Sequence, residues 1–402
     1  MAFKKYLRSL GLIVVTLLGV NAMFNWFIDP YGIYDSPRIE GFNANKSQRH
    51  EYLQRALSIY DGEAEAVIIG TSRSLAGLDA EHPLLTPLKA ENLSIGGSSA
   101  YEEMRYYQNA LAFLPLKKAV LAMDFYSFNA YRNSLPAFDE RVLKIKPGGG
   151  RNLAASLQII GTALSIDTTF NSFYTIQRQG MTKLNAESIK EKFLWSERHM
   201  MNKVYFSQPH FRNATISQDG KIDTTSYFRQ MIRMSFDHGV DVSVVLSPAH
   251  ARQQAVISEL GLWENYEQWK RALVRIISEE TKKTESEARV QFFDFSGFNE
   301  FTTEPVPPSG SNGGSPKMRW YIDSSHYNRA LGNKILDRVI GPKTDERATA
   351  KPFGVLLTED NIDAHLGDIR ARKKRWYAAH PEDVMEIRAI ANELFARKVI
   401  KQ

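Results

Sequence analysis

Five short apolar segments, separated by segments of helical periodicity, constrain the fold of this chain more than any other feature. They span residues 66–69, 91–95, 119–123, 240–246 and 290–295. Strands of a parallel sheet have this composition because helices cover both of their faces. Apolar residues recur at helical spacing between them, notably at residues 101–114 and 260–277. The alternation predicts an α/β fold with a doubly wound parallel sheet.

An apolar run at residues 10–28 follows a basic segment, Lys4 to Arg8. Its length is close to the roughly 20 residues that one membrane crossing requires. Flanking basic residues favour the cytoplasmic side. We therefore expect a single-pass anchor in the cytoplasmic (inner) membrane, with the remaining chain extracytoplasmic, in the periplasm. A cleaved signal peptide is the alternative, because Val20-Asn21-Ala22 resembles a small-x-small cleavage site.

Composition shifts along the chain predict four parts. These are an anchor at 1–29, a connector with a first helix at 30–60, an α/β domain at 61–340 and a charged helical extension at 341–402. Within the domain, residues 131–225 contain no convincing strand segment and predict a mostly helical insertion. Residues 370–375 hold a cluster of basic side chains, which predicts a solvated helix face or, alternatively, a contact with an anionic lipid or polymer.

The absence of cysteine restricts the chemistry that this chain can perform. Without cysteine there is no disulfide, thiolate nucleophile or cysteine-based metal site. The net charge of +6 comes from scattered basic residues, and no nucleic-acid motif accompanies it. We expect no metal, no organic cofactor and no nucleic-acid partner, and any covalent catalysis must use another nucleophile.

The first predicted strand runs directly into Gly70-Thr71-Ser72-Arg73. Ser72 therefore stands at the carboxyl end of a strand, where open α/β sheets bind their ligands. A serine here is either a nucleophile or a helix cap. The turn differs from the nucleophile turn of α/β-hydrolases, which requires glycine where this chain has Ser74.

A second polar segment, Asp323-Ser324-Ser325-His326, precedes the last predicted helix of the domain. A serine hydroxyl needs a base, and a neutral imidazole needs a carboxylate to fix its tautomer and to stabilise the imidazolium. Asp323 and His326 can supply both. The alternative is an ordinary helix start, in which Asp323 or Ser325 acts as a cap. Among nine histidines, His326 alone combines an aspartate at this spacing with the start of a terminal helix.

Two further strand ends carry residues that suit a binding site. Residues 92–99 form a glycine-rich turn around Gly97, whose backbone N–H groups could hold an oxyanion or could simply connect a strand to a helix. His250 and Arg252 follow the fourth strand and are candidate substrate-binding residues, with a structural role as the alternative. Arg73, beside Ser72, either binds substrate or forms a salt bridge.

Taken in order, these motifs resemble the SGNH/GDSL hydrolase superfamily, whose blocks run Ser, Gly, Asn and Asp-x-x-His. The resemblance implies a three-layer, flavodoxin-like α/β/α fold. It implies a catalytic triad of Ser72, Asp323 and His326, and an oxyanion hole formed by Ser72 and Gly97. The third block departs from the family, because residues 123–129 lack an asparagine at the donor position and contain Asp124, another candidate substrate-binding residue.

The arrangement of an N-terminal anchor before such a domain also resembles that of envelope proteins of teichoic acid D-alanylation and alginate O-acetylation. That resemblance implies a serine acyl-esterase or O-acyltransferase acting on an acylated carbohydrate or cell-envelope polymer. The resemblance also suggests a membrane-bound acyltransferase as a partner. The alternative is a catalytically silent subunit that binds the polymer or such an acyltransferase, and the missing third-block asparagine supports it.

We predict one membrane crossing, with the carboxyl terminus outside the cytoplasm. Alkaline phosphatase fused after Gln402 should be active in cells, because the basic segment Lys4 to Arg8 should remain in the cytoplasm. Fluorescence from a fused reporter that matures only in the cytoplasm would contradict this topology.

Overall fold

The computed structural model describes most of the chain and divides it into two compact units. The described residues are 2–34, 36–46, 51–60, 62–132, 134, 137–179, 188–205, 214–217, 219–308, 318–341 and 353–399. The first unit comprises Met1–Gly62 and Pro136–Asn185, and the second comprises Glu63–Leu135 and Ala186–Gln402. The segment 131–225, predicted as one insertion, is thus divided between the two units.

The second unit contains a six-stranded sheet in the order β2-β1-β3-β4-β5-β6. Its strands are β1 (Ala66–Gly70), β2 (Glu91–Asn92), β3 (Lys118–Met123), β4 (Asp241–Leu246), β5 (Val290–Asp294) and β6 (Val355–Leu356). The first five are parallel and β6 is antiparallel to β5. The mixed α/β fold and the five predicted strands are confirmed. The two-residue β6 was not predicted, because two residues are too few to show a periodic pattern in the sequence.

The strand order creates a switch point between β1 and β3. The chain leaves β1 for β2 on one side and then returns to β3 on the other side. In open α/β sheets, the crevice at such a point, at the carboxyl ends of the strands, is the usual ligand site. Ser72 follows β1 and Asp124 follows β3, so both residues stand at this crevice.

Helices surround the sheet in the second unit. They are α3 (Ser72–Gly77), α4 (Ala100–Phe113), α7 (Ile189–His199), α8 (Thr225–Asp237), α9 (Ala251–Glu259), α10 (Trp263–Thr281), α11 (Arg329–Ile340), α12 (Ile362–Ala379) and α13 (Pro381–Val399). Short 3-10 segments are η2 (Thr86–Leu88) and η3 (Phe125–Phe128), and η5 (Met200–Tyr205) is a π-helix. Every residue of β1 is buried, as expected for a strand covered on both faces.

Helix α11 packs into the core and approaches α3 at backbone distance. Its buried residues Leu331, Ile335 and Leu336 share one apolar cluster with Ile68 and Val120 of the sheet. A Cβ atom on Gly332 would lie 1.7 Å from the carbonyl oxygen of Gly77 in α3. Glycine is therefore required where these two helices meet, and α3 begins at Ser72 while α11 begins shortly after His326.

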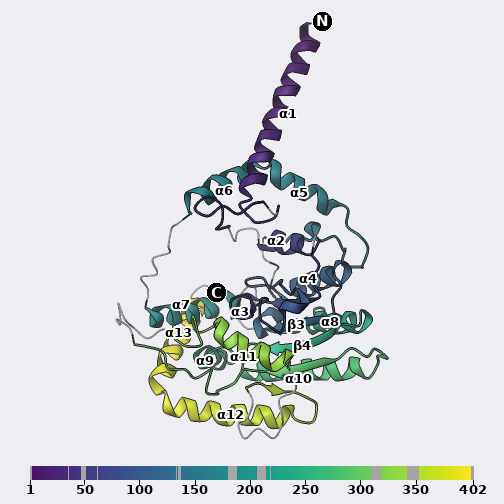
Figure 1. Ribbon diagram of the computed structural model, residues 1–402. Coiled ribbons are helices and arrows are strands. Elements are labelled where there is room, and N and C mark those ends of the chain that lie inside the picture. Colours follow the sequence, from purple (N-terminus) through teal and green to yellow (C-terminus); the bar gives the residue numbers. More distant parts are fainter. Residues whose placement is uncertain are drawn as a thin grey trace. The chain divides into compact units, whose positions relative to one another are not determined.

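The first unit is built around the N-terminal helix α1 (Ala2–Ile28). The segment Phe3–Ile28 is the one helix among the described residues that is long and apolar enough to cross a membrane. This agrees with the expected anchor, while the orientation stays a prediction. The unit also contains α2 (Glu51–Ser58), η4 (Glu140–Val142), α5 (Ala154–Leu164) and α6 (Ile166–Gln177), and α5 and α6 pack against the end of α1 (Figure 1).

Candidate active site

Ser72 is the first residue of α3, immediately after β1. The cap of this helix is Thr71, whose side-chain oxygen accepts a hydrogen bond from the Arg73 backbone N–H. Thr71, and not Ser72, therefore caps this helix, so the alternative interpretation of Ser72 as a helix cap does not apply. It is half-buried, and its Oγ lies 2.9 Å from Nε2 of His326.

His326 and Asp323 complete a chain of hydrogen bonds with Ser72. Nδ1 of His326 lies 2.8 Å from Oδ2 of Asp323, so the carboxylate orients the ring with Nε2 toward the serine. The other carboxylate oxygen accepts the backbone N–H groups of Ser325 and His326 at 2.7 and 3.0 Å. The D-x-x-H turn thus positions its own carboxylate through main-chain hydrogen bonds.

The environment keeps Asp323 ionised. Burial raises the pKa of its carboxyl, but the hydrogen bond and charge of His326, together with the two backbone N–H groups, lower the pKa below its ordinary value. An ionised Asp323 is the form that fixes the imidazole tautomer and stabilises an imidazolium. The arrangement therefore has the geometry and the charge that proton removal from Ser72 requires.

Arg73, the residue after Ser72, forms a buried ion pair with Asp124. Arg73 Nη1 lies 2.7 Å from Asp124 Oδ1, and both side chains are almost fully buried. The Nε of Arg73 also donates to the Oγ of Ser325 at 3.1 Å. Burial lowers the pKa of Arg73, but the charge and hydrogen bond of Asp124, together with Tyr126 and Tyr205, outweigh this and raise it. Of the two roles expected for Arg73, substrate binding or a salt bridge, the structure shows the salt bridge. Arg73 also joins the turn after β1 to the turn that carries His326.

Gly97 lies in the turn between β2 and α4, with a φ of +73° that favours glycine. The next residue, Ser98, donates its hydroxyl to the carbonyl of Gly70 at 3.2 Å, which attaches this turn to the end of β1. The carbonyl of Gly97 accepts a hydrogen bond from Arg132. The Gly97 turn is consequently held at the strand end that leads into Ser72.

The segment after β3 contains an asparagine that the motif comparison did not assign. Asn129 stands at the end of η3 with a side chain that is buried, and its Oδ1 accepts the Tyr131 backbone N–H at 3.0 Å. Within the described part of the chain its Nδ2 has no hydrogen-bond partner. Sequence order gave no reason to select it, because it stands beyond the donor position of the third block.

His250 and Arg252 differ from the sequence expectation, because the structure places both in the protein interior. Arg252 is fully buried and forms ion pairs with Glu197 and Asp383. His250 is buried, and its Nε2 hydrogen-bonds to the carbonyl of Glu304 at 2.8 Å. Burial lowers the pKa of His250 to about 4, so its ring is neutral near pH 7. These contacts leave neither side chain available to a substrate.

Helix α7 contributes residues near Asp323 that sequence reasoning missed. Ser196 donates its hydroxyl to Asp323 at 3.2 Å. His199 has an exposed side chain, and partial desolvation and the charges of Lys203 and His326 lower its pKa. Trp195, 62% exposed, stacks on His199 with ring centroids 5.0 Å apart. No local motif marked this helix, which lies in the predicted insertion.

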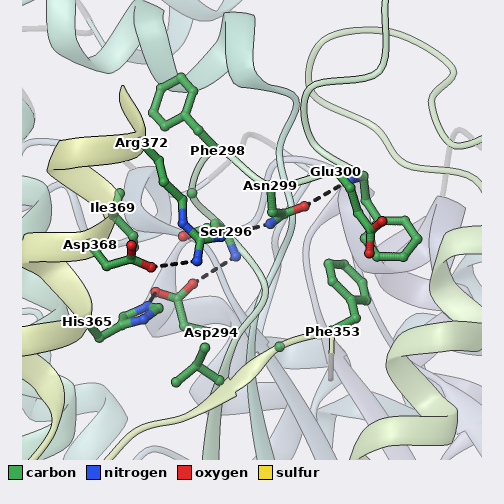
Figure 2. A pocket seen from close by; sticks show the side chains of 14 residues that line it. Asp294, Ser296, Phe298, Asn299, Glu300, Phe353, His365, Asp368, Ile369 and Arg372 are labelled. Carbon is green, nitrogen blue, oxygen red and sulfur yellow. Dashed lines mark hydrogen bonds and ion pairs between the residues drawn. The ribbon is translucent and has the colours of Figure 1, made fainter. Parts of the chain in front are cut away.

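A separate cavity of about 260 Å³ lies at the carboxyl end of β5 and contains no triad residue. Figure 2 shows its buried Asp294 beside His365, and Asp368 beside Arg372. Asp294 also pairs with Lys270 at 2.7 Å, so its charge is balanced internally. Across the residues that the structure describes, no group of three or more His, Cys, Asp or Glu side chains could hold a metal ion.

The sequence matches no known protein-family model, and a search of curated proteins finds no relative of it. The assignment of the site therefore depends on its geometry.

The buried Arg73–Asp124 pair should contribute strongly to stability. Arg73→Ala leaves a buried carboxylate without its partner, so we expect the free energy of unfolding to fall by about 3–5 kcal/mol. The control is Arg329→Ala, which removes an exposed pair with Asp79 and should cost about 0–1 kcal/mol. Chemical denaturation of the full chain in detergent measures both. Equal losses would show that the buried pair does not hold the site together.

Proposed function

We propose that this chain is a membrane-anchored, extracytoplasmic serine esterase or O-acyltransferase of the SGNH/GDSL type. The observation that carries the proposal is the hydrogen-bonded chain Ser72, His326, Asp323 at the carboxyl end of β1. Its members come from opposite ends of the α/β domain, and Ser72 stands at the switch point where such sheets bind ligands.

In the proposed mechanism, Ser72 Oγ attacks the carbonyl carbon of an ester while His326 Nε2 takes the hydroxyl proton. Asp323 stabilises the imidazolium that forms. The backbone N–H groups of Ser72 and Gly97 donate to the oxyanion of the tetrahedral intermediate. His326 returns the proton to the departing alcohol, which leaves an acyl group on Ser72. Water then discharges this acyl group in an esterase, or a sugar hydroxyl does so in a transferase.

The exposed Trp195 supports a carbohydrate as the substrate class. An indole face that is open to solvent offers an apolar platform to a sugar ring. Trp195 stacks on His199 and precedes Ser196, whose hydroxyl bonds to Asp323, and this supports a platform near the triad. An acylated envelope polysaccharide suits this arrangement, and the apolar helix α1 would keep the enzyme at the membrane where such polymers are exported. A membrane-bound acyltransferase is the partner that could supply an acyl group for transfer.

The second candidate is a catalytically silent subunit that binds polymer or a membrane acyltransferase. The observation that favours it is the third block, which has Asp124 paired to Arg73 and no asparagine at the family's donor position. The enzyme proposal is preferred because a silent protein has no need for an ionised Asp323 that orients His326 toward Ser72.

The triad predicts how two histidine variants should differ. A serine-directed fluorophosphonate should label Ser72 in the full chain, and the protein should hydrolyse p-nitrophenyl acetate. His326→Ala should reduce acyl transfer by about a thousandfold or more, since triad members act as a unit.

His250→Ala is the matched control, because it removes a histidine that contacts Glu304 rather than Ser72. It should lower thermal stability while leaving Ser72 open to labelling in the folded fraction. The reverse pattern would assign the base to His250. Absence of labelling in a folded wild-type chain would favour the silent subunit.

Substitution of Trp195 tests the substrate class. Trp195→Ala should raise KM for an acylated oligosaccharide by about tenfold, while kcat and the labelling rate of Ser72 change little, because the platform binds sugar without entering the chemistry. Met385→Ala, which truncates an exposed apolar side chain on α13, is the control and should change neither constant. An unchanged KM in the Trp195 variant would argue against a sugar platform.

A further inference from the structure

Helix α6 in the first unit has its polar and apolar faces exchanged relative to a helix on a water-soluble core. Its buried side chains are all polar: Thr168, Asn171, Ser172 and Thr175. Its exposed side chains include Ile166, Phe170 and Phe173, which are 71%, 70% and 60% exposed. Exposed large apolar residues on one face mark a surface that contacts something other than water.

Helix α5 continues this exposed apolar surface. Leu153, Leu157 and Ile160 are 86%, 72% and 57% exposed, and their spacing places them on one helical face. From residue 154 to residue 177, Asp167 is the one acidic or basic side chain. Arg151 and Arg178 stand just outside the two ends of this segment. The result is a two-helix apolar surface with basic residues at its margins.

The buried polar face of these helices is bonded to the end of α1. Asn25 is fully buried, and its Nδ2 donates to the carbonyl of Ala163 at 2.8 Å and to Thr169 Oγ1 at 3.1 Å. The hydroxyl of Ser172 donates to Asn25 Oδ1 at 2.9 Å. Polar side chains often join helices in this way where the surroundings are lipid.

Ring packing extends the contact beyond these hydrogen bonds. The rings of Phe24 and Phe173 lie 4.9 Å apart. In Figure 1, α5 and α6 diverge from the carboxyl-terminal end of α1 within the same unit. The exposed apolar surface of α5 and α6 is therefore continuous with the apolar surface of the helix that is suited to cross a membrane.

We propose that α5 and α6 lie in the interfacial layer of the bilayer that α1 enters, with their exposed apolar faces in contact with lipid. With 11 and 12 residues, each helix is about half the length that a crossing requires, so neither can span the membrane. Helices with one apolar face and basic residues at the margin bind the headgroup boundary of anionic membranes. The attachment to α1 fixes this location, and the proposal is independent of the catalytic one.

The absence of cysteine from the chain makes a direct test straightforward. Single cysteines at Leu157→Cys and Phe170→Cys would carry an environment-sensitive fluorophore in the full chain, reconstituted into phosphatidylethanolamine and phosphatidylglycerol vesicles. Lipids with brominated acyl chains should quench most of the fluorescence of both labels, and aqueous iodide should quench little of it. Both native side chains are exposed, so the substitutions should not disturb folding.

Two further labels calibrate the measurement. Val15→Cys, on the exposed surface of α1, should be quenched by brominated lipid, and Lys374→Cys, on the exposed surface of α12, should be quenched by iodide alone. Free access of iodide to the Leu157 and Phe170 positions would overturn the proposal. Protection of both positions from both quenchers would also overturn it, because a protein, either a second copy or another partner, would then cover them. If brominated lipid did not quench the label at Val15, α1 would not lie in the bilayer and the proposal would fail.

Discussion

The candidate site depends on one buried ion pair, Arg73 with Asp124. The guanidinium follows β1, the carboxylate follows β3, and the same guanidinium bonds to Ser325 in the turn that carries His326. Three segments that are distant in the sequence therefore converge on one buried charge. Separating them would leave an ion without a partner in the interior, which is among the most costly defects that a fold can contain. The positions of Ser72 and His326 follow from this constraint, because each stands next to a member of the network.

The sheet and the positions of Ser72, Asp323 and His326 could be predicted because their signals are local. Continuous apolar runs identify buried parallel strands, and a polar residue directly after such a run stands at the edge where ligands bind. Ser72 satisfied both conditions, the Asp323–His326 turn was recognised from its spacing ahead of a helix, and the structure joins them by hydrogen bonds.

The same rule was insufficient for His250 and Arg252. Position after a strand does not reveal whether a side chain faces the crevice or the interior. Arg252 forms ion pairs with Glu197 and Asp383 in the interior, and Asp383 belongs to a C-terminal helix that is distant in the sequence. Ser196 and Trp195 were missed because their helix has no sequence motif and reaches Asp323 only through tertiary packing. Likewise, the expectation of a mostly helical insertion at 131–225 did not indicate that the apolar sides of α5 and α6 face outward.

The contact between Gly77 and Gly332 affects how the site can move. Because main chain touches main chain there, no side-chain rotation can widen the gap between α3 and α11. The separation of the main-chain segments that carry Ser72 and His326 is then insensitive to rapid rotamer motions of the side chains around them. It can increase only when the helix pair separates as a whole, which is a rare event on the timescale of local unfolding. The site therefore stays ordered only while α11 remains packed against α3, and the two should be lost together.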